Sequence, residues 1–375
     1  MTRKRGNGEG SRPRKRPDGR WEARYTLYTS EGPKRKTLYG KTRQEVADKL
    51  ACVLSDRVQG LTFEAGGLKL REYLDRWLLN IRDTVRQRTW ERYEQIVRVH
   101  IKPTLGRIKL KGLTPTHVRG LYREKLDSGS SPRTVQYIHI TLRKALQDAV
   151  SDGLIPRNIA DGIKAPKPKK KEINPLSPEQ ARAFLATARG DRFEALYMLA
   201  IHCGLREGEL LGLKWDDVDL EAGTLRVRRT LSETRTGYVF ELPKNGKGRS
   251  IKLTQTASEA LRSHLSRQLE EIDGKGDDYR DQGLIFPSRK GTPMNARNLI
   301  SRSFKPILKR AGLPDIRLHD LRHTCATLML CEGVHIKLVQ ELLGHATVSI
   351  TLDTYSHLLP GMGDEAAGAM QRIFS

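Results

Sequence analysis

A proline-rich basic segment near the middle of the chain most strongly limits how the sequence can fold. Residues 164–176 read KAPKPKKKEINPL, which combines three prolines with a run of lysines. Such a composition favours a charged, semi-extended linker over a buried element. The chain has 375 residues, enough for two or three domains, and we therefore predict separate domains on either side of this linker.

Before the linker, residues 63–163 are predicted to form a compact bundle of four helices. Apolar side chains recur there at helical spacing, and Thr114 and Ser131 each precede a proline, as an N-cap does at the start of a helix. The second helix of the bundle is expected to stop before Pro103, because proline disfavours helical backbone in the residue before it.

Residues 1–62 are predicted to form a small sheet-plus-helix module. Residues 21–28 alternate at period two, as in a strand, and residues 34–39 supply a returning strand after a turn. Thr42 then caps a helix. Residues 12–17, RPRKRP, carry two prolines and no apolar side chain, which argues against a further strand there. The alternative for the whole module is a solvated basic tail.

After the linker, residues 177–375 are predicted to form a mixed, mainly helical domain with a small antiparallel sheet. Its first helix begins at Ser177, with Gln180 at the capping-box position. Three short strands are expected, near residues 224–230, 238–242 and 249–253. The fold class predicted for the chain is therefore multidomain and mainly α, with a small N-terminal β-sheet-plus-helix module and a helical bundle ahead of this domain.

The charge of the chain points to a polyanionic partner. The formal net charge is +24, and a surplus of this size repels itself in a compact fold. Residues 1–62 hold 16 basic and 7 acidic side chains and residues 63–165 hold 20 and 11, so +18 of the surplus lies before the linker. We expect nucleic acid as the partner, because the basic N-terminus is rich in Gly and Pro and lacks the apolar helix face that a membrane surface requires.

The apolar and cysteine content gives no sign of a membrane or secreted protein. No apolar run approaches the ~20 residues of a membrane span, and the N-terminus lacks the apolar stretch of a signal peptide. The cysteines have no zinc-like spacing and are predicted to be buried, reduced thiols of an intracellular protein. They are Cys52, Cys203, Cys325 and Cys331.

The third domain holds four separated groups of residues, two of which are basic patches. Arg206 precedes Glu209 by three residues, so both side chains lie on one helix face and the carboxylate can hold the guanidinium. Lys244, Lys247 and Arg249 crowd a glycine-rich turn between two strands, and such a turn can reach into a DNA groove. Taken singly, the first is more often a surface ion pair and the second an ordinary solvated hairpin.

The other two groups add imidazoles and a phenol. His319 and Arg322 are spaced i, i+3 on a helix whose opposite side is apolar, and such a pair suits a phosphate, since Arg forks onto two oxygens and His moves a proton. Gly344 ends a helix directly before His345, and Tyr355 follows ten residues later. A lone Tyr in this position is more often a core or surface aromatic.

Together and in this order, the four groups resemble the catalytic set of the tyrosine recombinases, also called lambda-type integrases. That set is an Arg, a β-hairpin Lys, a His-x-x-Arg, a further His or Trp, and a Tyr. The resemblance covers about residues 64–360, and residues 68–160 look like the family's helical core-binding domain. His323 and His357 adjoin the set and are read as structural or exposed. The matching residues are Arg206, Lys244, His319, Arg322, His345 and Tyr355.

The resemblance implies a covalent phosphotyrosine intermediate. Tyr355 attacks the scissile phosphorus and stays linked to the 3′ phosphate, so the energy of the bond is retained and no ATP is needed. A free Tyr has a pKa of about 10, so the attack needs help. His319 is the implied general base, and Lys244, or Lys247 from the same turn, protonates the leaving 5′ oxygen.

Positive charge from the protein replaces a metal in this scheme. Arg206 and Arg322 clamp the non-bridging oxygens, and His345 donates a further hydrogen bond in the transition state. Glu209 orients Arg206. No metal ion or other cofactor is implied.

The resemblance also implies two kinds of DNA site. Residues 1–62, which include the segment GRWEARY, look like the arm-binding domain of many integrases. The chain would then bridge core-type and arm-type sites on double-stranded DNA. Basic residues expected to contact DNA are Arg14, Lys15, Arg16, Arg20, Lys247 and Arg249.

Strand exchange needs four active sites, so the resemblance implies a homotetramer on DNA, with a DNA-bending host factor and an excision factor as further partners. The implied location is the bacterial cytoplasm, at the nucleoid. The tail, residues 364–375, docks either on a neighbouring protomer or on its own domain. Its apolar residues for this contact are Ala366, Met370, Ile373 and Phe374.

The function predicted from the sequence is therefore that of a site-specific recombinase of a mobile element, acting in integration, excision or both. A type IB topoisomerase-like enzyme uses the same chemistry without exchanging partners, and it is the first alternative. A non-catalytic DNA-binding regulator is the second, although such a protein would be expected to lack one of the six residues.

Overall fold

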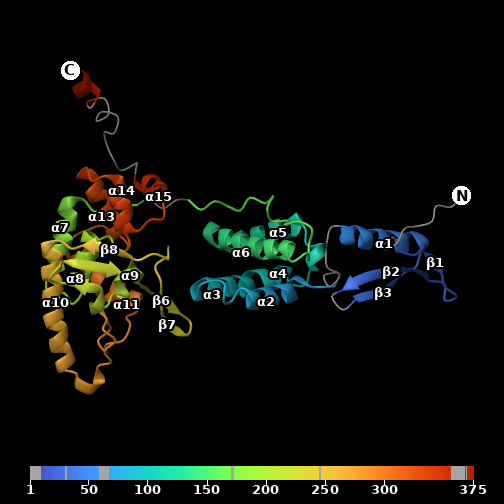
Figure 1. The fold of residues 1–375 in the computed structure, drawn as a ribbon, viewed down its shortest axis with the longest axis horizontal. Coiled ribbons are helices and arrows are strands. Elements are labelled where there is room, and N and C mark those ends of the chain that lie inside the picture. The colour runs from blue at the N-terminus through green and yellow to red at the C-terminus, as the bar shows by residue number, and fades with distance from the viewer. Residues whose placement is uncertain are drawn as a thin grey trace. The chain divides into compact units, whose positions relative to one another are not determined.

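The computed structural model describes residues 10–29, 32–58, 67–169, 173–244, 246–355, 368 and 370–375. The chain is mainly helical with small antiparallel sheets, as predicted (Figure 1). It divides into two compact units, Met1–Lys169 and Lys170–Ser375, and this boundary lies within the segment expected to be a linker.

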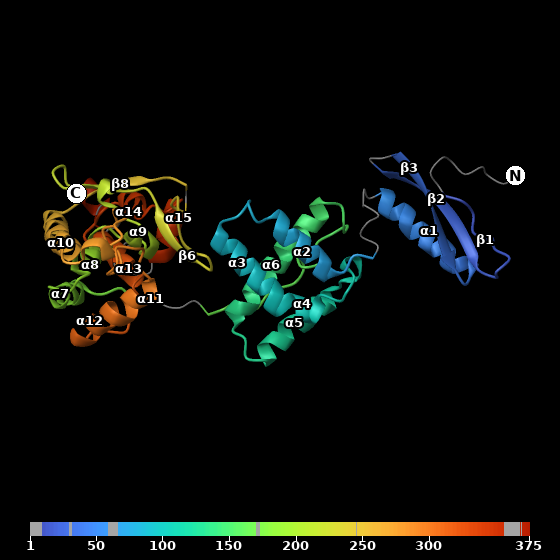
Figure 2. The ribbon, with the colours of Figure 1, turned by 90° about the horizontal axis from the view of Figure 1, so that it is seen from below.

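A three-stranded antiparallel sheet and one helix form the N-terminal module. The helix α1 (Arg43–Val58) lies along one face of the sheet, where Ala23, Val46 and Leu50 are buried (Figures 1 and 2). Thr42 begins the helix by accepting a hydrogen bond from the Glu45 amide at 3.1 Å. The strands, paired in the order β1-β2-β3, are β1 (Arg14–Lys15), β2 (Trp21–Thr29) and β3 (Gly32–Gly40).

The short strand β1 corrects one prediction, because residues 12–17 were expected to form no strand. Arg14 pairs with Glu22 in the antiparallel register. The prolines at 13 and 17 flank this two-residue edge strand and leave its ladder intact. Glu22 is buried and accepts hydrogen bonds from Arg14 Nε at 2.6 Å and from Arg16 Nη1 at 3.1 Å. These charge-assisted contacts anchor the strand in place of an apolar side chain.

A helical bundle follows, and α6 lies at its centre (Figure 2). Thr114 and Ser131 cap α5 and α6 as predicted. Tyr73 donates a buried hydrogen bond to the Ala145 carbonyl at 2.6 Å, and Trp77 donates to Asp148 at 2.8 Å, which ties α2 to α6. The helices are α2 (Leu70–Asn80), α3 (Gln87–Ile96), α4 (Lys102–Leu105), α5 (Pro115–Asp127) and α6 (Pro132–Ser151).

The second helix of the bundle does not stop before Pro103, so that prediction was wrong. A π-helical turn, η2 (Val97–Ile101), joins α3 to α4, and Pro103 lies in the first turn of α4. A π-helical turn contains one more residue per hydrogen bond than an α-helical turn, so the backbone hydrogen bonds start afresh after it. Proline lacks an N–H group, but in the first turn of a helix that group has no acceptor within the helix, so Pro103 is tolerated there. The same arrangement recurs at η6 (Ile300–Phe304), which also precedes a Lys-Pro pair.

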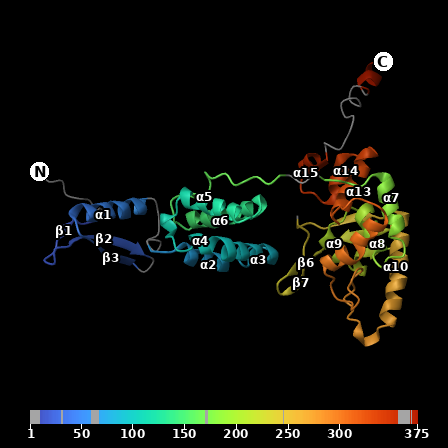
Figure 3. The ribbon, with the colours of Figure 1, turned by 180° about the vertical axis from the view of Figure 1, so that it is seen from behind.

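The second unit is built around α8 (Glu194–His202), which lies among its other helices (Figure 3). The side chains of α8 are nearly all buried. The helix contacts α7 (Pro178–Thr187), α10 (Gln255–Asp273) and α13 (Asp320–Cys331). The capping box predicted at Ser177 and Gln180 is present. The other helices of five or more residues among those described are α9 (Glu207–Leu211), α12 (Lys305–Arg310), α14 (Ile336–Leu343) and α15 (Val348–Tyr355).

Among its described residues, the second unit has five short strands in two sheets, where three strands were expected. The strands β4, β5 and β8 form one sheet, and β6 and β7 form a separate hairpin. The expected strand at 224–230 is in fact two elements, because it contains the whole of β5 and the first residue of β6. The strands β7 and β8 therefore belong to different sheets and do not pair as the expected hairpin. The strands are β4 (Val218–Asp219), β5 (Thr224–Val227), β6 (Thr230–Thr234), β7 (Gly237–Glu241) and β8 (Arg249–Lys252).

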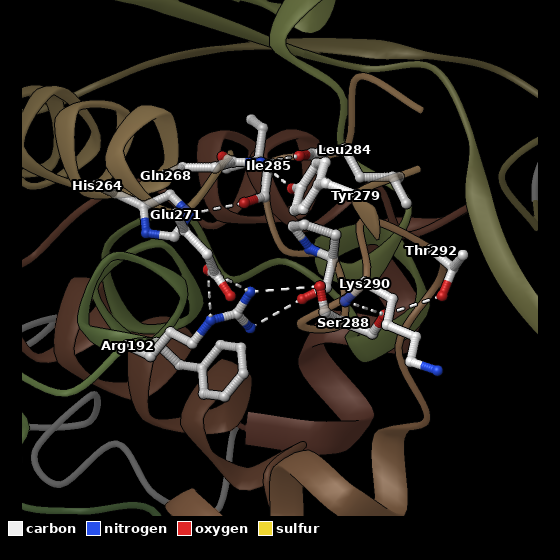
Figure 4. A network of polar contacts seen from close by, with 12 residues as sticks. Arg192, His264, Gln268, Glu271, Tyr279, Leu284, Ile285, Ser288, Lys290 and Thr292 are labelled. Atoms are coloured by element: carbon white, nitrogen blue, oxygen red, sulfur yellow. Dashed lines mark hydrogen bonds and ion pairs between the residues drawn. The ribbon is translucent and has the colours of Figure 1, made fainter. Parts of the chain in front are cut away.

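Side chains of α10, together with Arg192, bond carbonyl groups within residues 284–288 (Figure 4). His264 bonds the Ile285 carbonyl at 2.6 Å, and Gln268 donates to the Leu284 carbonyl at 2.9 Å. Arg192 donates to the Pro287 carbonyl at 2.9 Å. Buried carbonyl groups need such partners, so this network fixes α10 against the segment.

The structure bears on two further predictions, the absence of a membrane span and the burial of the cysteines. Within the described ranges, no helix is long and apolar enough to cross a membrane. Cys203 and Cys325 are buried and free, as predicted, whereas Cys331 is exposed and corrects the expectation of burial. The side chain of Cys52 lies outside the described residues.

Candidate active site

Arg206 is held in place at the start of α9. Its backbone amide donates to Glu209 Oε2 at 2.9 Å, and its Nη1 donates to Glu209 Oε1 at 2.7 Å. Its Nη2 donates to the Gly344 carbonyl at 3.2 Å. The i, i+3 pair expected from the sequence is therefore present, and it is joined to the end of α14.

Glu209 is shared between two arginines. Arg249 donates to it through Nη1 at 3.0 Å and Nη2 at 2.7 Å, and through Nε to the Leu342 carbonyl at 2.7 Å. Burial of the carboxyl opposes ionisation, but the hydrogen bond and charge of Arg249, with the charge of Arg206, lower the pKa of Glu209 to about 2. Arg249 was expected to reach DNA from a turn, and its guanidinium instead points inward to this carboxylate.

Arg322 is buried beneath the site. Its Nη1 donates to the Gly204 carbonyl and its Nη2 to the Leu343 carbonyl, both at 2.6 Å. Gly204 has a φ of 59°, and a Cβ there would lie 2.6 Å from Leu343. The sequence placed Arg322 on the polar side of its helix, opposite the apolar side, whereas only 2% of this side chain is exposed.

Arg206 and Arg322 together make a strongly positive, poorly solvated site. Burial, followed by the positive charge of Arg206, lowers the pKa of Arg322 to about 9. The repulsion between the two positive charges is reduced when an anion binds between them. The arrangement therefore favours a phosphate group.

His319 and His345 are both held neutral. His319 precedes α13 and keeps part of its ring exposed, yet burial and the neighbouring His323 and Arg322 lower its pKa to about 4. Burial and the charge of Arg322 lower the pKa of His345 to about 4 as well. The Nδ1 atom of His345 bonds the Thr351 hydroxyl at 2.9 Å, which orients its ring. Neutral imidazoles can accept or donate one hydrogen bond on each ring nitrogen.

Gly344 ends α14 as predicted, with a left-handed φ of 62°. A Cβ at this position would lie 3.0 Å from Arg249 Nη1. Glycine here lets the chain turn sharply, so that His345 follows the helix directly while Arg249 packs against the turn.

Tyr355 is the last residue of α15 and is almost fully buried. Only 1% of it is exposed, and it packs against Leu343 and Val339. Its hydroxyl lies 2.8 Å from Nδ1 of His323. Burial raises the pKa of Tyr355 to about 12, against the opposing charge of Arg322. The phenol is therefore a neutral group that needs a proton acceptor before it can attack.

The structure brings five of the six expected residues together. Arg206, His319, Arg322, His345 and Tyr355 surround one position in the second unit. Lys244 and Lys247 are exposed on the connection between β7 and β8.

Sequence reasoning missed two members of the site. Arg249 was assigned to DNA contact, and His323 was read as structural. The signal for His323 was its place next to Arg322 and four residues after His319. His357 lies outside the described residues.

No metal cluster is found in the described part of the chain: it has no group of three or more His, Cys, Asp or Glu side chains that could hold a metal ion. The groups that the site does offer are two guanidiniums, neutral imidazoles and a phenol. Such a set suits transfer of a phosphoryl group to a side chain.

Comparison with known proteins identifies the class. The phage integrase family model matches residues 174–361, and the N-terminal SAM-like domain of phage integrases matches residues 69–126. A tyrosine recombinase XerC-like protein of Caldanaerobacter subterraneus is 31% identical, over 91% of this chain and 92% of that protein. An integrase of Streptomyces ambofaciens is 28% identical, over 100% of this chain and 98% of that protein.

The chain therefore belongs to the phage integrase family, the tyrosine recombinases that cut and rejoin DNA. The resemblance stated from the sequence is confirmed.

Solved structures agree on the fold. The Tn1549 transposon integrase in complex with a circular intermediate DNA has a TM-score of 0.68 and 22% identity, covering 82% of this chain and 100% of that one. A lambda integrase tetramer bound to a Holliday junction has a TM-score of 0.57 and 20% identity, covering 90% of this chain and 96% of that one.

Proposed function

We propose that this recombinase integrates or excises a mobile genetic element, with Tyr355 as the nucleophile that forms a 3′-phosphotyrosine. The observation that carries the proposal is the placement of Tyr355 beside two guanidinium groups, those of Arg206 and Arg322. An integrase of Streptomyces ambofaciens and the Tn1549 transposon integrase are among the similar proteins, which supports a mobile-element role.

The phosphate is bound first in this proposal. Arg206 and Arg322 hold its non-bridging oxygens, and His345 donates a hydrogen bond that strengthens as negative charge develops. Because Glu209 and backbone carbonyls already fix both guanidiniums, little reorganisation is needed when the substrate arrives.

The chemical step exchanges one phosphodiester for another. His319, as the general base, takes the phenolic proton while the oxygen of Tyr355 forms a bond to phosphorus. The bond from phosphorus to the 5′ oxygen breaks, and the leaving oxygen takes a proton. Lys244 supplies that proton, and the exposed connection that carries it allows it to approach bound DNA. Lys247 is the alternative donor on the same connection. Because Tyr355 is buried in the DNA-free chain, the phenol must move before attack.

The two N-terminal modules bind DNA in this proposal. Residues 63–163 grip the core-type site, and residues 1–62 bind an arm-type site. In the sheet of the first module Lys15 is exposed, and Arg16 lies 5.3 Å from the Tyr39 ring, which supports a basic, aromatic contact surface. Arg14 and Arg20 also form ion pairs, with Glu22 and Asp18, which orient them.

Four copies of the chain assemble on DNA at the host nucleoid, where they exchange strands with the help of bending and excision factors. The tail docks on a neighbouring protomer. Its apolar side chains favour this arrangement, because 55% of Met370, 69% of Ile373 and 80% of Phe374 are exposed.

A nicked suicide duplex tests the proposal. It carries the repeated core sequence that flanks the encoding gene, and its nick lets the cleaved fragment escape. We expect a protein–DNA adduct that resists SDS, and no adduct from Tyr355→Phe. An adduct formed by Tyr355→Phe would show that another residue is the nucleophile.

A further inference from the structure

The hydroxyl of Tyr355 is held by an imidazole that the proposed mechanism does not use. In the part of the chain that the structure describes, its hydrogen-bond partner is Nδ1 of His323, at 2.8 Å. The two ring centroids are 5.6 Å apart. His323 lies on α13 directly after Arg322, so one helix turn carries both a phosphate-binding group and the partner of the phenol.

Charged and titratable groups surround His323 on several sides. From α13 and the residues just before it come Asp320, Arg317 and Arg322, and the His319 ring meets the His323 ring edge-on at 5.0 Å. From α15 comes Tyr355, and His345 also lies close enough to interact. Burial lowers the pKa of His323 below its ordinary value, against the opposing charge of Asp320. Its ring is therefore neutral at pH 7, and Nδ1 can accept a proton.

We propose that His323 is a catalytic residue that accepts the phenolic proton of Tyr355. The inference rests on the proposed role of Tyr355 as the nucleophile. As the O–H bond breaks, its proton passes to Nδ1 of His323 and the oxygen forms its bond to phosphorus. The bond to the 5′ oxygen breaks, and that oxygen takes its proton from the lysine. When the strand is rejoined, His323 returns the proton to the phenolate.

Geometry favours His323 over His319 for this role. His319 contacts the ring of His323, whereas His323 contacts the hydroxyl itself. A general base must lie within hydrogen-bond reach of the proton that it removes. His319 is then left free to donate to the phosphate. The charge of Arg322 also acts on Tyr355, so the phenol that His323 holds already lies near a guanidinium proposed to bind the phosphate.

The first experiment measures single-turnover cleavage of the nicked suicide duplex by the full chain at pH 7. His323→Ala removes the acceptor, and His323→Asn keeps an oxygen that can accept a hydrogen bond but cannot take the proton. We expect both to cleave about a hundredfold more slowly at saturating enzyme, with unchanged DNA affinity. His202→Ala is the matched control, because it removes another imidazole that bonds a hydroxyl, that of Thr254 at 3.0 Å, and should cleave normally.

The second experiment separates loss of the base from loss of the acid. A duplex with sulfur at the bridging 5′ position has a thiol leaving group, which departs without a proton donor. This substrate should restore cleavage by Lys244→Ala and leave His323→Ala slow. The rate for His323→Ala should also keep rising with pH above 7, where the wild type has levelled off.

The outcomes distinguish this inference from the proposed function. Normal cleavage by both His323 variants, or their rescue by the sulfur substrate, would overturn the role of His323 while Tyr355→Phe still forms no adduct. If His323→Ala does not fold, His323→Asn decides. An adduct from Tyr355→Phe would instead overturn the nucleophile.

Discussion

Arg249 and Glu209 form a two-point ion pair, with Nη1 3.0 Å from Oε1 and Nη2 2.7 Å from Oε2. The same carboxylate holds Arg206, so a residue on β8 fixes the arginine at the start of α9 that is proposed to bind the phosphate. Arg249 also follows the connection that carries Lys244. The ion pair therefore links Arg206, which is proposed to bind the phosphate, to the connection that carries the proposed proton donor Lys244.

Arg249→Lys should slow cleavage about tenfold to a hundredfold without weakening DNA binding. Lysine keeps the charge but cannot fork onto both oxygens, and hydrogen bonds to charged groups contribute about 1.5–3 kcal/mol. Single-turnover cleavage and a gel-shift titration measure the two effects. Arg226→Lys, an exposed arginine on the neighbouring strand, is the control. An equal loss of DNA affinity would mean that Arg249 contacts DNA after all.

Glu209→Gln should lower the free energy of unfolding at pH 7 by about 3 kcal/mol, since the pKa of Glu209 falls from its ordinary value to about 2. Because the pKa of Glu209 is lower in the folded chain than in the unfolded chain, its ionised carboxylate stabilises the fold fully at pH values above the unfolded pKa of 4.5. This stabilisation is lost as the pH falls from 4.5 towards 2. The difference between wild type and variant in urea unfolding should therefore shrink over that range. Glu270→Gln, at an exposed position on α10, is the control and should show no such difference.

The features that were predicted correctly from the sequence are those that depend on residues a few positions apart in the chain. Arg206 with Glu209, the cap at Ser177 and the glycine turn before His345 are all local patterns, and the structure has them. The sequence could not reveal that Arg249 turns inward to Glu209, 40 residues away, or that His323 meets Tyr355, 32 residues away. Such contacts depend on packing between elements.

The errors in secondary structure have similar physical causes. Pro103 was expected to end a helix, but a π-helical turn accommodates it. The strand at Arg14 was missed because strands are recognised in a sequence by alternating apolar side chains, and this strand has none. An ion pair between Arg14 and the buried Glu22 anchors it instead. The loop with Lys244 was read as a hairpin because it joins two strands that follow each other in the sequence. Those strands pair with other partners, β7 with β6 and β8 with β5, and the sequence does not show which strands pair.

Replacing the exposed apolar residues of the tail should block strand exchange and spare cleavage. Met370, Ile373 and Phe374 changed together to Ser remove the surface proposed to dock on a neighbour. The suicide duplex reports cleavage, and recombination between two full attachment sites reports exchange. Normal recombination by the triple variant would rule out docking on a neighbouring protomer.

Lys15→Ala should weaken arm-type DNA binding uniformly across sequences. Each phosphate contact contributes about one unit to the slope of log affinity against log salt, so the slope should fall by about 1. Core-type cleavage should not change. Titrations at several salt concentrations, with Lys49→Ala on α1 as the control, measure the slope. A slope equal to that of the wild type would remove Lys15 from the DNA surface.

The most direct test of the account is to locate the covalent bond. The adduct formed on the nicked duplex is digested with protease, and the peptide that retains the nucleotide is identified by mass spectrometry. We predict that the nucleotide is attached to Tyr355, and that Tyr238→Phe forms the adduct normally whereas Tyr355→Phe forms none. Attachment to any other residue would contradict the account.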